Sequence, residues 1–94
     1  MEIVGRAAVE RFAAKYAAAR SPLARWSQIV ADANWRAPND VKRAFGTGVD
    51  FVGGTTIFDI GGNKYRLLAF LDFAKQRLIV KAVLTHEQYD RRGV

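Results

Sequence analysis

The stretch TTIFDIGGNKYRLLAFL, residues 55–71, decides the fold. Its β-branched and aromatic residues stand on both sides of a Gly-Gly pair, which is typical of two antiparallel strands joined by a tight turn. A second turn at residues 72–76 leads into another apolar stretch. The sequence therefore predicts three consecutive antiparallel strands, at residues 56–60, 63–71 and 77–84.

Side-chain alternation predicts which face of the second hairpin is buried. Pairing Leu71 with Leu78 brings two apolar sets onto one face: Tyr65, Leu67, Ala69 and Leu71 on one strand, and Leu78, Val80, Ala82 and Leu84 on the next. The opposite face then carries Lys64, Arg66, Leu68 and Phe70, with Ile79, Lys81, Val83 and Thr85 beside them. This register places Arg66 opposite Val83 and diagonal to Lys81. We expect Arg66 to lie open to solvent, so that its truncation costs little stability.

The N-terminal half has the spacing of helices. Residues 1–4 are predicted to form a short strand, and apolar residues follow at helical intervals in residues 6–16. Ser21-Pro22 is typical of the N-cap and first position of a second helix, and a short third helix is predicted at residues 39–45. The order predicts one α+β domain, 1–94, in which an N-terminal strand and two to three helices pack on one face of a mainly antiparallel sheet of about four strands.

The charge of the chain favours a polyanionic partner. Fifteen Lys and Arg residues against nine Asp and Glu residues give a net charge of +6, and the pI is about 10.2. Residues 60–94 hold seven basic and three acidic residues, a net charge of +4, so the excess lies in the C-terminal third. A basic domain of this kind is a candidate for binding nucleic acid.

The composition also argues against several classes of protein. The chain has no cysteine, which excludes disulfides, thiolate metal sites and cysteine nucleophiles, and its single histidine does not favour a metal site. No apolar run approaches the roughly 20 residues that span a bilayer, so we expect no membrane association. The first residues lack the pattern of a signal peptide.

Two C-terminal motifs resemble those of a known family. They are Asp59-Ile60-Gly61-Gly62-Asn63-Lys64-Tyr65-Arg66-Leu67 and, after a hydrophobic hairpin, Thr85-His86-Glu87-Gln88-Tyr89-Asp90. With the length, the helix-first order and the Ala-Pro-Asn-Asp-Val-Lys segment at 37–42, they resemble the HigB-type toxins of bacterial toxin–antitoxin pairs, within the RelE-like ribonuclease superfamily. The resemblance implies a cytoplasmic, metal-independent endoribonuclease that needs no cofactor. It implies cleavage of mRNA, often on the ribosome, and silencing by a HigA-type antitoxin with a helix-turn-helix domain.

The residues of these motifs suit cleavage of RNA by its own 2′-hydroxyl. Arg66 is the expected clamp for the phosphorane, because its planar fork matches phosphate oxygens, and Lys64 adds charge. His86 is the leading acid or base, because it normally titrates near neutrality. Tyr89 is expected to orient the nucleotide, stack on a base or donate a proton. The residues expected to bind RNA are Lys81, Asn63, Arg77 and Arg43.

Other interpretations of the same residues stay open. The basic strand face is also what a solvated sheet face looks like. His86 at a strand end is equally consistent with a structural cap, and Tyr89 with packing. A non-catalytic RNA-binding module needs only the basic face and Tyr89. An interaction protein that docks on an acidic partner needs only the charge.

Overall fold

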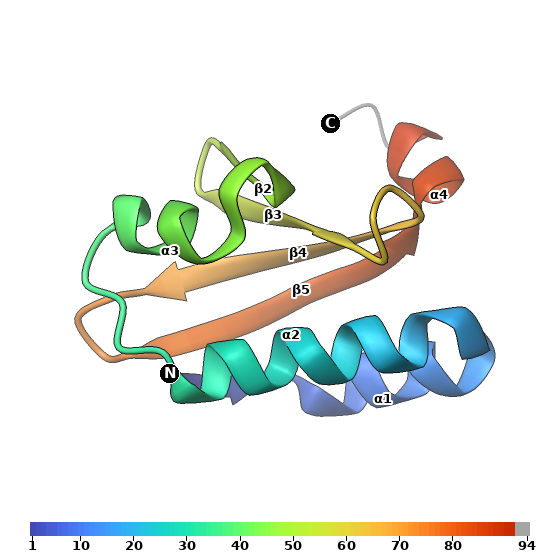
Figure 1. The fold of residues 1–94 in the computed structure, drawn as a ribbon, viewed down its shortest axis with the longest axis horizontal. Helices are drawn as coiled ribbons and strands as arrows, with labels where there is room; N and C mark the ends of the chain where they lie inside the picture. The colour runs from blue at the N-terminus through green and yellow to red at the C-terminus, as the bar shows by residue number, and fades with distance from the viewer. Residues whose placement is uncertain (92–94) are drawn as a thin grey trace.

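The computed structural model describes residues 1–91, which form a five-stranded sheet with helices around it (Figure 1). The strands lie in the order β1-β5-β4-β3-β2, and all neighbours are antiparallel except the parallel pair β1 and β5. The predicted α+β fold class is confirmed. The elements are β1 (Glu2–Val4), α1 (Arg6–Lys15), α2 (Arg20–Asp32), α3 (Pro38–Phe45), β2 (Val49–Val52), β3 (Thr55–Ile60), β4 (Tyr65–Asp72), β5 (Arg77–Thr85) and α4 (His86–Arg91).

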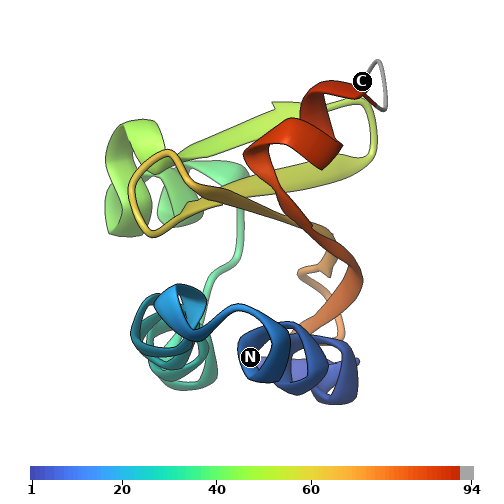
Figure 2. The same cartoon turned by 90° about the vertical axis from the view of Figure 1, so that its right-hand side faces the viewer.

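The core lies between the sheet and the first two helices. Figure 2 shows α1 and α2 side by side in one layer, with the strongly twisted sheet curving above them. The largest fully buried side chains are Trp26 and Leu23 of α2 and Phe58, Leu67 and Leu78 of the sheet. Within residues 1–91, the other face of the sheet carries no helical layer, except where α4 lies against β4 and β5 at one end. No helix within residues 1–91 is both long and apolar enough to cross a membrane.

The sheet has one strand more than predicted. Residues 49–52 pair with β3, from Val49 opposite Phe58 to Val52 opposite Thr55. Gly53 takes a positive φ of 59° in the turn between them, a conformation that glycine adopts without strain. The strand is only four residues long and mostly exposed, so its alternation is too short to be distinguished from a loop.

The second helix begins earlier than predicted. A 3₁₀ turn at Ala17–Ala19 runs directly into α2 at Arg20, with Ala19 as N-cap, and no side-chain cap bond is made. Pro22 therefore occupies the third helical position instead of the first. The first four N–H groups of a helix have no partner within it, so a proline in the first turn removes no hydrogen bond.

A β-bulge changes the predicted register of the second hairpin. Leu71 pairs with Leu78 as predicted, but the register shifts between Leu68 and Ala69, which pair with Ala82 and Val80. Lys81 is therefore an extra residue on β5.

Because side chains alternate along a strand, the bulge places every later residue of β5 on the opposite face of the sheet from the one predicted. Arg66 pairs with Leu84 instead of Val83, and Val83 packs against the core. The prediction that Val83 and Thr85 share the open face is wrong, since they pair with the core residues Leu67 and Tyr65.

The short helix α3 depends on the carboxylate of Asp40. Its Oδ2 accepts hydrogen bonds from the backbone N–H of Arg36, at 2.9 Å, and of Ala37, at 3.2 Å. The bond from Arg36, then that from Ala37, and the nearby charges of Arg43 and Arg36 hold the pKa of Asp40 below its ordinary value of 3.8. The ionised carboxylate therefore stabilises the start of α3.

We predict that Asp40→Ala lowers the melting temperature at neutral pH, because these two N–H groups lose their acceptor. A depressed pKa contributes stability that is present above the ordinary value and is lost as the pH falls through the folded-state value. The gap between wild type and Asp40→Ala should therefore shrink below pH 3.8 in thermal unfolding measured against pH. Asp50→Ala, on the exposed strand β2, serves as control. A gap that stays constant into acid would contradict the capping role.

Candidate active site

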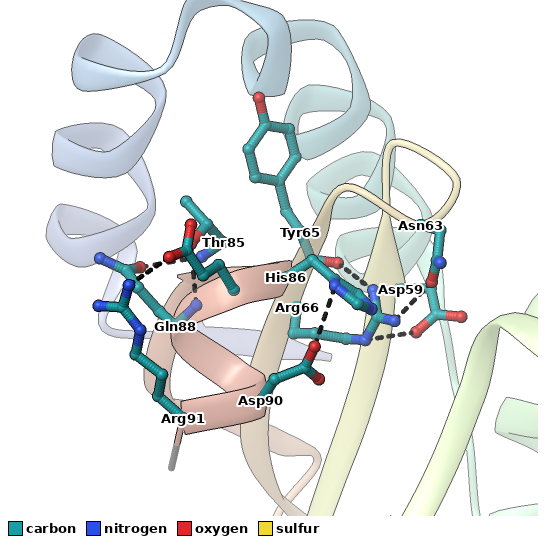
Figure 3. A network of polar contacts seen from close by, with 10 residues as sticks. Asp59, Asn63, Tyr65, Arg66, Thr85, His86, Gln88, Asp90 and Arg91 are labelled. Atoms are coloured by element: carbon teal, nitrogen blue, oxygen red, sulfur yellow. Dashed lines mark hydrogen bonds and ion pairs between the residues drawn. The ribbon is translucent and has the colours of Figure 1, made fainter.

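Arg66 lies at the centre of the candidate site, on the sheet face opposite α1 and α2 (Figure 3). Its Nε lies 3.2 Å from Oδ1 of Asp59, the residue directly across on β3. Its Nη1 donates to the backbone carbonyl of Tyr65 at 3.0 Å, and its Nη2 donates to Oδ1 of Asn63 at 2.5 Å. The residue is only 9% exposed. The guanidinium is thus held in place from three sides, by two hydrogen bonds and one ion pair, with further N–H donors left over.

This burial corrects the expectation that Arg66 is open to solvent. The strand face was predicted correctly, but Asp59, Asn63 and the helix α4 cover the guanidinium there. Truncation of Arg66 would leave Asp59 and Asn63 without their partner, so a cost in stability is expected.

The turn before β4 brings Asn63 to Arg66. Gly61 and Gly62 both have positive φ, 64° and 71°, which suits consecutive glycines in a tight hairpin turn. The chain then reverses within a few residues, so that Asn63 lies beside the first residues of β4. The Gly-Gly signal that predicts the hairpin therefore also positions a functional side chain.

The helix α4 closes the other side of the site. Its start is a capping box: the Thr85 N–H donates to Oε1 of Gln88 at 2.9 Å, and the Gln88 N–H donates to Oγ1 of Thr85 at 3.1 Å. The His86 N–H donates to the carbonyl of Lys64 at 2.8 Å and ties the helix to the turn. The Tyr89 ring centroid lies 5.6 Å from Cζ of Arg66, a cation–π contact.

His86 contributes the imidazole of this cluster. Its Nδ1 lies 3.3 Å from Oδ2 of Asp90, one helical turn away, and its side chain is 44% exposed. A carboxylate at Nδ1 orients the imidazole and leaves Nε2 for another partner. The cluster thus combines a fixed guanidinium from Arg66, an accessible imidazole from His86 and a phenol from Tyr89. Together they can bind an anion and transfer protons.

The structure gathers some of the predicted residues and separates others. One cluster contains four of them: Asn63, Arg66, His86 and Tyr89. The backbone carbonyl of Lys64 also contacts this cluster, while the Lys64 side chain is exposed. Lys81 lies further along the same face, where its Nζ donates to Oγ1 of Thr55 at 2.9 Å.

Arg77 and Arg43 lie outside this cluster. Arg77 starts β5, eight residues from Thr85, which is about 26 Å along a strand, and pairs with Glu2 at 3.0 Å. Arg43 pairs with Asp40 on α3 at 3.3 Å, with its side chain 77% exposed. Their expected roles in RNA binding stay predictions.

Sequence reasoning missed Asp59, Asp90 and Gln88 as parts of the site. Counting outward from the predicted Gly61-Gly62 turn pairs Arg66 with Ile57, whereas the turn contains four residues, 61–64, and this pairs Arg66 with Asp59. The Thr-x-x-Gln spacing at 85–88 is a capping-box signal that predicts a helix start. Among residues 1–91, no three His, Asp or Glu side chains gather in a way that would hold a metal ion.

Comparison with known proteins identifies the family of this chain. Residues 19–92 match the HigB toxin family, described as the RelE-like toxic component of a toxin–antitoxin system. The chain belongs to this family. The predicted resemblance to HigB-type toxins is therefore confirmed.

Curated HigB relatives match over nearly the whole chain. The mRNA interferase HigB of Escherichia coli O6:H1 (strain CFT073) is 27% identical over 93 residues, which cover 97% of this chain and 90% of the relative. The mRNA interferase toxin HigB of Escherichia coli K12 and the mRNA interferase HigB of Shigella flexneri are each 25% identical over 92 residues, covering 96% of this chain and 88% of each relative.

We predict that the Thr85→Val variant of this HigB family member loosens α4 without unfolding the sheet. The substitution removes the hydroxyl that accepts the Gln88 N–H, and loss of an N-cap of this kind costs about 1 kcal/mol. Hydrogen exchange should therefore become faster at the Gln88 amide and stay unchanged in β4. Gln88→Glu keeps an acceptor for the Thr85 N–H and serves as control. Unchanged exchange at Gln88 in Thr85→Val would show that docking on Lys64 alone holds the helix.

Proposed function

We propose that this toxin is an mRNA interferase that cuts mRNA in the cytoplasm, including mRNA on the ribosome, through attack by the RNA's own 2′-hydroxyl. The observation that carries the proposal is the buried Arg66, fixed by Asp59 and Asn63 and placed beneath a helix that presents His86 and Tyr89. Its relatives in Escherichia coli and Shigella flexneri are named mRNA interferases, which supports the same activity here.

Arg66 is the proposed clamp for the phosphate that is cut. Two of its five N–H donors bond to Tyr65 and Asn63 and its Nε pairs with Asp59, which leaves further donors for phosphate oxygens. Because the guanidinium is already held, it does not reorganise when charge builds up on the phosphorane. Donors fixed in this way are among the most effective means of stabilising a transition state.

His86 is the proposed acid or base, acting through Nε2. The 2′-oxygen attacks phosphorus as it gives up its proton, and the bond from phosphorus to the 5′-oxygen breaks as that oxygen gains a proton. The products are a 2′,3′-cyclic phosphate and a 5′-hydroxyl. Asp90 at Nδ1 positions the imidazole for one of the two proton transfers, and Lys64 and Tyr89 are the candidates for the other.

As the toxic component of a toxin–antitoxin system, the protein has an antitoxin as its partner. We propose that this antitoxin is of the HigA type, with a helix-turn-helix DNA-binding domain. The reading frame next to the toxin gene is the place to look for it.

Induced expression of the chain should arrest the growth of a bacterial host and fragment its mRNA, because the proposed activity destroys transcripts. Mapping of mRNA ends should find new 5′-hydroxyl ends, and co-expression of the antitoxin should restore growth. Normal growth with intact transcripts, at verified expression of folded protein, would contradict the proposed function. Tight RNA binding without new ends would instead favour a binding module.

Arg66→Lys should abolish most cleavage while keeping the fold. Lysine retains a charge to face Asp59 but lacks the planar fork, and loss of one transition-state donor typically costs on the order of 100- to 1,000-fold in rate. Single-turnover cleavage of mRNA in vitro measures the effect, and thermal unfolding checks the fold. Near-full activity in a folded Arg66→Lys variant would remove Arg66 from the chemistry.

His86→Gln should slow cleavage and leave RNA affinity unchanged, because glutamine keeps a hydrogen-bonding group but does not titrate. Single-turnover cleavage and binding of an uncleavable RNA measure the two effects separately. Asp90→Asn is the matched comparison, since it removes the charge at Nδ1 and keeps the imidazole, so its effect should be smaller. A wild-type cleavage rate in His86→Gln would make His86 a structural residue.

A further inference from the structure

Phe70 exposes an aromatic ring on the same sheet face as Arg66. It lies four residues further along β4, about 13 Å away at the rise of a strand, and is 42% exposed. Its ring is therefore accessible from the open face of the sheet. We refer to the exposed ring of Phe70, together with the neighbouring Thr55 of β3, as the Phe70 patch.

Lys81 carries a positive charge to the edge of this patch. Its ammonium bonds Oγ1 of Thr55, which belongs to β3, whereas Lys81 belongs to β5, so its side chain crosses over the intervening strand β4. Thr55 precedes Thr56, the partner of Ala69, and therefore lies beside Phe70. Among residues 1–91, no carboxylate lies within ion-pair distance of Lys81.

The bulge in β5 is what makes this arrangement possible. As the extra residue of the bulge, Lys81 stays on the open face, while Val80 and Val83 on either side of it pack against the core. Bulges next to functional sites commonly aim a side chain in this manner. The carboxylate nearest along β4, Asp72, accepts the backbone N–H of Lys75 at 3.1 Å.

We propose that the Phe70 patch binds one nucleotide of the single-stranded mRNA near the cleaved bond. Lys81 holds a phosphate, and the base stacks on the ring of Phe70. This inference rests on the proposed function, and it adds a subsite that supplies affinity away from the reacting atoms. A cation beside an exposed aromatic ring, in line with a second cation at Arg66, is the pairing that single-stranded nucleic acid requires. A surface that docks a protein partner would use the exposed ring of Phe70, but it would not require the ammonium of Lys81 beside it.

Phe70→Ala tests the stacking. The probe is a short mixed-sequence RNA with 2′-O-methyl groups, which keeps bases and phosphates but lacks the attacking hydroxyl. Loss of one base–aromatic stack should weaken its affinity by about 5- to 150-fold. The matched control is Ile79→Ala, which removes an apolar side chain that is 37% exposed and pairs directly with Phe70 but has no ring. Thermal unfolding should be nearly unchanged in both variants.

Phe70→Trp provides a direct readout. The native tryptophans, Trp26 and Trp35, are 2% and 6% exposed, so the new indole would be the one that reports on solvent and ligand. Stacking of a base should quench its fluorescence when the RNA is added. Lys81→Ala should weaken the binding and reduce the slope of log affinity against log salt by roughly one unit or less, as expected for one phosphate contact.

The outcomes separate this inference from the proposed function. If wild type neither binds nor cuts RNA, the proposed function fails and the inference fails with it. If wild type cuts RNA while Phe70→Ala binds the probe like wild type, the inference alone is overturned. Equal losses in Phe70→Ala and Ile79→Ala would also overturn it, because a general apolar contact, such as a protein-docking surface, would then explain both. Loss in Phe70→Ala alone, with quenching in Phe70→Trp, supports it.

Discussion

A guanidinium that is nine-tenths buried must find partners for its N–H groups, and in this chain Arg66 finds them on three different segments. A buried charge that lacks such partners is strongly destabilising. Asp59 on β3, Asn63 in the turn and the carbonyl of Tyr65 supply them here. The hydrogen bond to Asn63 therefore ties the turn to the side chain of Arg66, and the ion pair with Asp59 ties that side chain to β3.

The same guanidinium also supports the helix α4. A helix of six residues is too short to be stable by itself, so its order comes from its ends and from what it packs against. The capping box at Thr85 satisfies its start, the bond from His86 to Lys64 ties it to the turn, and Tyr89 rests on Arg66. His86 is thus placed by the capping box and by contacts with Lys64 and Arg66 at the start of β4. The two motifs that resemble the family are distant in sequence but form one unit in the fold.

The hairpin could be predicted from sequence because Leu71 and Leu78 meet at a short turn and alternate with polar or exposed residues near it. Beyond Val80 the alternation gives no guidance, since residues 82–84 are all apolar and either face accepts them. Only the packing of Val83 against the core decides between the two registers, and that contact is between distant parts of the chain. The burial of Arg66 escaped prediction for a similar reason. Alternation indicates a face of the sheet, but not that a turn and a terminal helix close over it.

In the proposed mechanism, Arg66 contributes mainly to the rate of cleavage, whereas Lys81 and Phe70 contribute to the affinity for RNA. Asp59 partly neutralises Arg66, so this residue is a weak attractor of phosphate in the ground state. Its remaining donors act most strongly when a dianionic phosphorane forms beside them, which favours the transition state over the bound substrate. Affinity must then come from elsewhere. Lys81 and Phe70 lie on the same strand face and have no part in the chemistry, so binding energy can be gained there without weakening the preference of Arg66 for the transition state.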